Sequence, residues 1–177
     1  MVIFSKNENY NMKRQLKAVL AVLLVFMMTF LLCGCGGDKD KVVKSEGMSI
    51  TLSKEYQKST LANATWYYTS PDGLAMGIRS KKDDIEKSGL ETNSVQDYAE
   101  AYIKANSIPG SPKVRQRNGY AYFQYNRKVS GTDYSYYSCV YDHGDEFWLV
   151  TFACYKELYN EYKEDFVASS NSVTFED

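Results

Sequence analysis

Residues 134 to 155, "YSYYSCVYDHGDEFWLVTFACY", have the pattern of two β-strands around a short turn. Gly144 and Asp145 are turn formers, and the runs on either side are rich in tyrosine, valine and phenylalanine, which favour strands. With these two residues as the turn, Cys139 lies opposite Val150. We therefore predict a hairpin within a mostly antiparallel sheet.

The same hairpin decides the state of the two cysteines outside the N-terminal segment. Cys154 lies four residues beyond Val150, which at about 3.3 Å per residue places it roughly 13 Å from Cys139 along the strand. A disulfide needs Cα atoms within about 7 Å of each other. We expect both residues to be buried free thiols.

Turn signals on both sides mark further hairpins. Pro71-Asp72-Gly73 separates two β-rich runs, because proline presets φ and glycine accepts a positive φ. Asn118-Gly119 and Ser130-Gly131 are typical of two-residue hairpin turns. The predicted strands are Gly47–Leu52, Thr65–Ser70, Leu74–Ser80, Lys113–Arg117, Tyr120–Val129, Thr132–Tyr141, Glu146–Cys154 and Ser172–Phe175.

Two helices are predicted between these strands. Ser94 is an N-cap residue and Asp97, three positions on, completes a variant of the capping box, so that a helix should run from there to about Asn106. Glu157–Ser169 has a face formed by Leu158, Tyr159, Tyr162 and Phe166 at helical spacing. The charged stretch between Lys81 and Asn93 is predicted as a surface loop.

The fold class predicted from this order is α+β, a mostly antiparallel curved sheet with two amphipathic helices packed on it. The "GMSITLSKEY" start, the "SPDG" hairpin, the "SVQDYAEAYIKAN" helix and the "YKEDFVASSNSVTFE" close resemble the PsbP-like fold. That fold belongs to an extrinsic subunit of photosystem II, and related domains occur as bacterial lipoproteins. The resemblance implies a binding or assembly role with no shared catalytic residues.

The N-terminal segment is predicted as an export signal. Basic residues at 13, 14 and 17 precede an apolar run over residues 18–32 that is too short to span a membrane. Met12 makes a more ordinary start than Met1. Leu32-Cys33-Gly34-Cys35 resembles the lipobox of bacterial lipoproteins, in which a small residue precedes the lipid-bearing cysteine. The resemblance implies that residues 1–34 are removed and that Cys35 carries the lipid.

The mature chain would then be one small acidic domain on a tether. Removing residues 1–34 takes away four of the 21 Lys and Arg and one of the 22 Asp and Glu, which leaves a net charge of −4. With no basic block, we expect no nucleic-acid partner, and attachment to a membrane must come from the lipid. We predict a lipidated N-terminus and flexible tether over residues 35–46, rather than a strand at Val42-Val43, and a single domain over residues 47–177.

Patterns that carry chemistry are sparse. His143, the one histidine, lies among Asp142, Asp145 and Glu146, but this set matches neither zinc nor EF-hand spacing, so we interpret it as a solvated turn. No nucleophile motif and no phosphate-binding loop occurs. Surface carboxylates such as Asp83, Asp84 and Glu86 could in principle act in pairs on a glycan.

The tyrosines are the most unusual feature, with 15 of the 16 lying after the signal. Because strand side chains alternate between faces, they either form a two-sided core or leave one aromatic face bare for a protein or glycan partner. From these observations we expect a lipid-anchored, extracytoplasmic, non-enzymatic binding or assembly module without a cofactor. The alternative is a surface hydrolase acting on cell-wall or glycan substrates through paired carboxylates.

Overall fold

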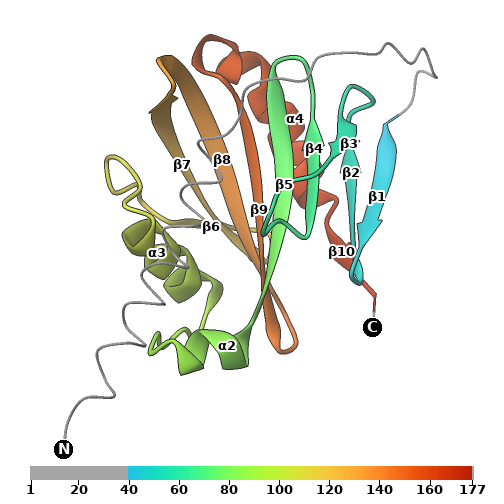
Figure 1. Cartoon of the computed structure of the whole chain (residues 1–177). Helices are drawn as coiled ribbons and strands as arrows, with labels where there is room; N and C mark the ends of the chain where they lie inside the picture. Colours follow the sequence, from blue (N-terminus) through green and yellow to red (C-terminus); the bar gives the residue numbers. More distant parts are fainter. Residues whose placement is uncertain (1–39, 177) are drawn as a thin grey trace, which may run out of the picture.

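The computed structural model describes residues 40–176, and the predicted signal, Met12 and Cys35 lie outside this range. Its main element is a seven-stranded sheet in which every neighbouring pair is antiparallel (Figure 1). From one edge to the other, its strands are β3 (Gln57–Ser59), β4 (Trp66–Thr69), β5 (Gly73–Lys81), β9 (Glu146–Tyr155), β8 (Thr132–His143), β7 (Tyr120–Val129) and β6 (Arg115–Arg117).

The predicted central hairpin is confirmed. Strand β8 ends at His143 and β9 begins at Glu146, so that Gly144 and Asp145 form the turn. Cys139 lies opposite Val150, as the sequence predicted. The turns Asn118-Gly119 and Ser130-Gly131 are also confirmed, and all four residues have positive φ, as the hairpin turns that match strand twist require.

A second, three-stranded sheet corrects one prediction. It consists of β1 (Lys41–Ser45), β2 (Met48–Leu52) and β10 (Thr174–Phe175), with β2 in the middle. The prediction of a flexible tether over residues 35–46 is therefore wrong from Lys41 onward. Val43 is the reason, because it pairs with Ile50 and both side chains are buried against the large sheet.

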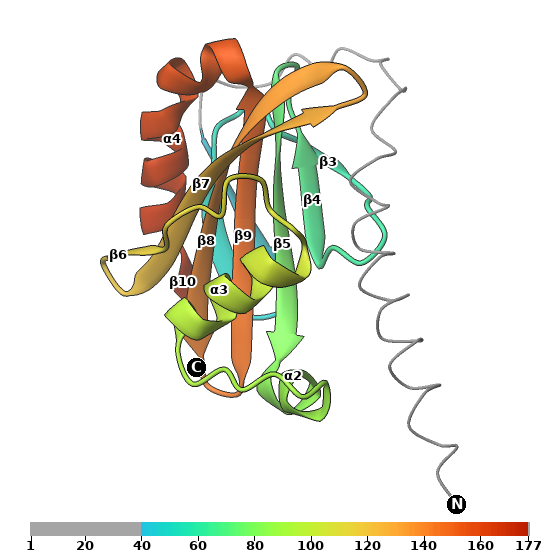
Figure 2. The same ribbon diagram turned by 90° about the vertical axis from the view of Figure 1, so that its left-hand side faces the viewer.

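The helices pack on opposite faces of the large sheet. Figure 2 shows α3 (Val95–Ala105) in front of the sheet, and Figure 1 shows α4 (Tyr159–Asn171) and the small sheet on the other side. A short 3₁₀ turn, η1 (Lys156–Leu158), leads into α4 and replaces the first turn of the predicted helix. A fold of α+β class with two packed helices is confirmed.

The cap of α3 forms with a difference. The Ser94 hydroxyl accepts a hydrogen bond from the Asp97 backbone N–H, as predicted. The Asp97 carboxylate accepts from the Ser94 hydroxyl at 2.8 Å and from the backbone N–H of Asn93, rather than from that of Ser94. The three groups still close the helix start.

Two further elements were not predicted. Strand β3 has the sequence "QKS" and forms only because its backbone pairs with the edge of β4. Helix α2 (Lys82–Lys87) lies in the segment predicted as a loop, and its Ile85 packs against the core on the α3 side. Neither element has an apolar periodicity of its own.

The tyrosines form a two-sided core. On one face, Tyr120, Tyr137 and Tyr141 pack under α4 and the small sheet, in what we call the α4 core. On the other, Tyr125 and Tyr136 stack with ring centroids 4.6 Å apart beneath α3. The alternative of a bare aromatic face is wrong, since the exposed large hydrophobic residues of the described chain are Val42 and Leu90.

The two cysteines are free and buried, as expected. Burial raises the pKa of Cys139 to about 12 and that of Cys154 to about 11. The Cys139 Sγ lies 3.2 Å from the Ser170 Oγ, which donates to the Phe166 carbonyl, so the thiol is the donor of this pair. Both sulfurs are neutral packing groups.

A tight contact joins β4 to β5. Trp66 lies opposite Gly77, and a Cβ atom built on Gly77 would be 2.1 Å from the Trp66 Nε1. The indole therefore lies directly on the glycine backbone, where it closes one end of the α4 core.

We expect Gly77→Ala to lower the free energy of unfolding by about 2 kcal/mol, because the added methyl group must displace a buried indole. Urea unfolding measures this. In a Trp66→Leu background, the same substitution should cost less than half as much. An equal cost in both backgrounds would show that the indole is not the obstacle.

Candidate functional site

The hairpin turn around His143 is held by ion pairs and ring packing. The Lys82 Nζ lies 2.7 Å from an Asp142 oxygen, and Glu146 pairs with Arg79. The His143 ring stacks on Phe175 with centroids 4.6 Å apart and planes 9° apart. The residues singled out from the sequence therefore form one turn, in which the carboxylates of Asp142 and Glu146 are already paired with cations.

The surface carboxylates do not converge on a cavity. Asp83, Asp84 and Glu86 lie on α2, and one of them, Asp84, pairs with Lys87 on the same helix. Within residues 40–176, no three His, Cys, Asp or Glu side chains are grouped so that they could hold a metal ion. None of the helices in this range is long and apolar enough to cross a bilayer.

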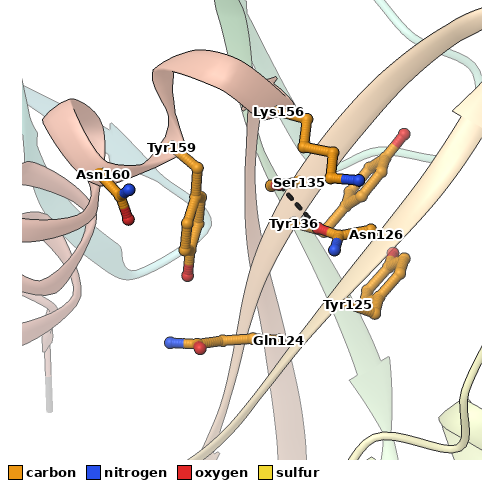
Figure 3. A pocket seen from close by; sticks show the side chains of 8 residues that line it. All are labelled: Gln124, Tyr125, Asn126, Ser135, Tyr136, Lys156, Tyr159 and Asn160. Atoms are coloured by element: carbon orange, nitrogen blue, oxygen red, sulfur yellow. Dashed lines mark hydrogen bonds between the residues drawn. The ribbon is translucent and has the colours of Figure 1, made fainter.

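A polar cleft of about 400 Å³ lies between β7–β8 and the start of α4 (Figure 3). Strand residues form one wall, and the segment from η1 into α4 forms the other. Its lining consists of Gln124, Tyr125, Asn126, Ser135, Tyr136, Lys156, Tyr159 and Asn160.

The cleft lies where the side chains on one face of the sheet change from aromatic to polar. Strand alternation places Gln124 and Asn126 on the same face as Tyr120 and Tyr122, where the α4 core lies. Asn126 is opposite Ser135 of β8, so polar groups from two strands continue an otherwise aromatic face. Strand β9 ends at this level and turns into η1, whose Lys156 borders the cleft together with Tyr159 of α4.

Most of the polar groups in the cleft have hydrogen-bonding capacity to spare. The Ser135 hydroxyl donates to the Asn126 Oδ1 at 2.7 Å. In the described part of the chain, the amides of Gln124 and Asn160 make no hydrogen bond and Lys156 makes no ion pair. Figure 3 shows Lys156 reaching toward the β7–β8 wall. The cleft thus offers amide donors and acceptors together with one positive charge.

Tyr159 has a hydroxyl group that lacks a hydrogen-bond partner within the described range. Its hydroxyl is buried and has no hydrogen-bond partner among residues 40–176, which is an unfavourable state for a polar atom. Burial raises the pKa of Tyr159 to about 12, so the phenol is neutral and can both donate and accept. Of the seven such buried polar atoms in residues 40–176, it is the one whose residue lines the polar cleft, where a bound water or a polar ligand would satisfy it.

A second cavity of about 290 Å³ lies at the other end of α4. There the Tyr120 hydroxyl donates to Asn171 at 3.1 Å, and the Tyr141 hydroxyl donates to the Ser170 carbonyl at 2.8 Å. Asp142 is the carboxylate in its lining. Neither cavity brings two carboxylates together.

Sequence reasoning did not identify the polar cleft. Its lining comes from three segments that are distant in the chain, near positions 124, 135 and 156–160, so no local motif announces it. One signal was available: Gln124 and Asn126 interrupt the aromatic run "YAYFQYN" on the side that should face a helix. A polar pair on a core face indicates either a buried network or a site.

The comparisons with known proteins concern the fold. The solution structure of cyanobacterial PsbP from Synechocystis is similar, with a TM-score of 0.53 and 11% identity over 83% of this chain and 98% of that one. The Ran-binding protein Mog1p of Saccharomyces cerevisiae has a TM-score of 0.51 and 6% identity, over 78% and 96% of the two chains.

A crystal structure from Bacteroides thetaiotaomicron matches with a TM-score of 0.50 and 12% identity over 74% of this chain, which spans less than half, 46%, of that protein. No protein-family model matches this chain, and no curated protein matches it in sequence. At these identities the likeness shows the fold, and the PsbP-like architecture predicted from the order of elements is confirmed.

We predict that Tyr159→Phe leaves the free energy of unfolding unchanged or raises it by up to about 1 kcal/mol, since it removes an unsatisfied hydroxyl. Tyr141→Phe, the matched control, should lower it by about 1 kcal/mol because its hydroxyl donates to a buried carbonyl. Urea unfolding of both variants provides the test. Equal destabilisation would mean that the Tyr159 hydroxyl has a partner in the free protein.

Proposed function

We propose that this chain is a lipid-anchored, extracytoplasmic binding module that holds a glycan in its polar cleft without chemical change. The unpartnered Tyr159 hydroxyl beside the free amides of Gln124 and Asn160 carries the proposal. Hydroxyl-rich ligands use amide and phenol groups of this kind as both donors and acceptors. An apolar peptide would leave them unsatisfied.

The anchor rests on the sequence around Cys35. A lipid on this sulfur suits a body with a net charge of −4, which an anionic membrane surface repels. Because β1 begins at Lys41, six residue steps separate the anchor from the folded domain. At about 3.5 Å per step the connection spans at most roughly 21 Å, so the domain is held near the lipid surface.

The binding role draws support from the chemistry of the cavities. The polar cleft has no carboxylate in its lining, and the second cavity has Asp142 alone. Paired carboxylates flanking a sugar, which glycoside hydrolysis requires, are therefore missing from both. Mog1p, a Ran-binding protein of similar fold, illustrates that this architecture can serve as a binding module.

The anchor predicts a sharp difference between two neighbouring cysteines. Cys35→Ser should move the protein from the membrane fraction to the soluble or unprocessed fraction, because the lipid-bearing sulfur is lost. Cys33→Ser is the control and should leave both membrane attachment and mass unchanged. Fractionation and mass spectrometry of the N-terminal peptide read out the result. Membrane attachment that survives Cys35→Ser would refute the lipid anchor.

The ligand is sought with the full chain in detergent on an array of envelope glycans, followed by calorimetry of the glycans that bind. We expect Gln124→Leu with Asn160→Leu to weaken binding at least about tenfold, since each change leaves a ligand hydroxyl without a partner. Gln57→Leu with Gln96→Leu removes two surface amides elsewhere and should have no effect. If no glycan binds, or if both pairs act equally, the cleft is not the site.

A further inference from the structure

We propose that the polar cleft is one end of a longer cationic seam along α4, and that its ligand is an acidic glycan, a chain of sugars bearing carboxylates. This inference rests on the proposed function and specifies the ligand class. The seam is the strip between the flank of α4 that faces β7 and the edge strand β6.

The two cavities lie along the same side of α4. Asn160 lines the polar cleft near the start of the helix, and Asn171 lines the second cavity near its end. They are eleven positions apart, which is just over three turns, so both lie on one flank about 16 Å apart. Lys163, Glu164 and Val167 fall on or beside this flank at the intermediate positions.

The opposite wall is the edge strand β6. Arg115 lies opposite Tyr122 and Arg117 opposite Tyr120, so both arginines are on the face of the sheet that carries α4. Both are exposed, and Arg117 is close enough to Tyr120 for their side chains to interact. Tyr120 in turn lines the second cavity.

The positive charges along the seam are uncompensated. Among residues 40–176, Arg115, Arg117, Lys156 and Lys163 make no ion pair. Of the other cations in this range, Arg79 is paired with Glu46 and Glu146, whereas Lys58 on β3 and Lys104 on α3 also make no ion pair. Asp142 lines the second cavity, but Lys82 lies 2.7 Å from it. Glu164, one turn of α4 beyond Asn160, borders the same flank, so the strip holds an excess of cations rather than cations alone.

The lining chemistry selects a sugar chain over other anions. Arginine forks bind carboxylates through two parallel hydrogen bonds, and four separated cations suit acid groups that repeat along a chain. The amides of Gln124, Asn160 and Asn171 and the Tyr159 hydroxyl lie between and beside them, where sugar hydroxyls would be satisfied. The half-buried ring of Tyr122 adds an apolar surface on which a sugar face can rest.

The test uses the full chain in detergent with oligogalacturonate as the probe and its methyl ester as the neutral counterpart. We expect the acid to bind at least about tenfold more tightly than the ester, and its affinity to fall as sodium chloride is raised, because exposed charges are screened. Arg115→Gln with Arg117→Gln should weaken binding of the acid at least about tenfold and flatten the salt dependence.

The matched control is Lys58→Gln with Lys104→Gln, which removes two exposed positive charges from β3 and α3. It should leave binding unchanged, because neither residue borders the seam. Circular dichroism and urea unfolding establish that all variants fold, as expected for substitutions of exposed side chains. A loss of binding equal to that of the arginine pair would mean that only net charge matters and would overturn the seam.

The remaining outcomes separate this inference from the proposed function. If acid and ester bind equally and only the Gln124 and Asn160 variants lose binding, the seam is refuted while the glycan-binding cleft stands. If an acidic peptide or an oligonucleotide binds in an arginine-dependent way and no glycan does, the assignment to a sugar chain is refuted. If none of these probes and no glycan on the array binds, both proposals fail.

Discussion

The pairing of β8 with β9 is the constraint on which the rest of this structure depends. A two-residue turn fixes their register, and a shift by one residue would send every side chain of the hairpin to the opposite face. Because both strands carry large side chains on both faces, each face must be covered. Helix α3 covers one face, and α4 with the small sheet covers the other.

The features that the sequence predicted are those encoded by neighbouring residues. The turns at Gly144, Gly119 and Gly131 depend on φ values that glycine accepts at little cost, and the α3 cap depends on two side chains three positions apart. The sequences of strand β3 and helix α2 contain no comparable local signal, neither a turn glycine nor a capping pair. A three-residue polar strand exists because β4 offers it a backbone edge, and α2 is held through Ile85 against the core.

The candidate site lies still further from sequence-level prediction. Tyr159 looks like an ordinary core tyrosine on an amphipathic helix, and the fact that its hydroxyl has no partner emerges only from packing. The arginines of β6 look like an ordinary polar edge strand until the register places them beside tyrosines of the α4 core. The site therefore comes from the same alternation that builds the core, at the place where the apolar cover ends.

The small sheet has a mechanical consequence for the lipid anchor proposed at Cys35. The first pair of the β1–β2 hairpin, Lys41 with Leu52, lies at the end where tension from an anchor would enter. Force applied there opens backbone pairs one at a time instead of shearing all five together. Strand β1 would peel away as a short extensible spring, and β2 would stay clamped by β10 and by the Glu176 N–H bonded to the Gly47 carbonyl. The connection to the anchor would thus lengthen under load by roughly 17 Å, and β1 would withdraw the buried side chain of Val43 from the α4 core.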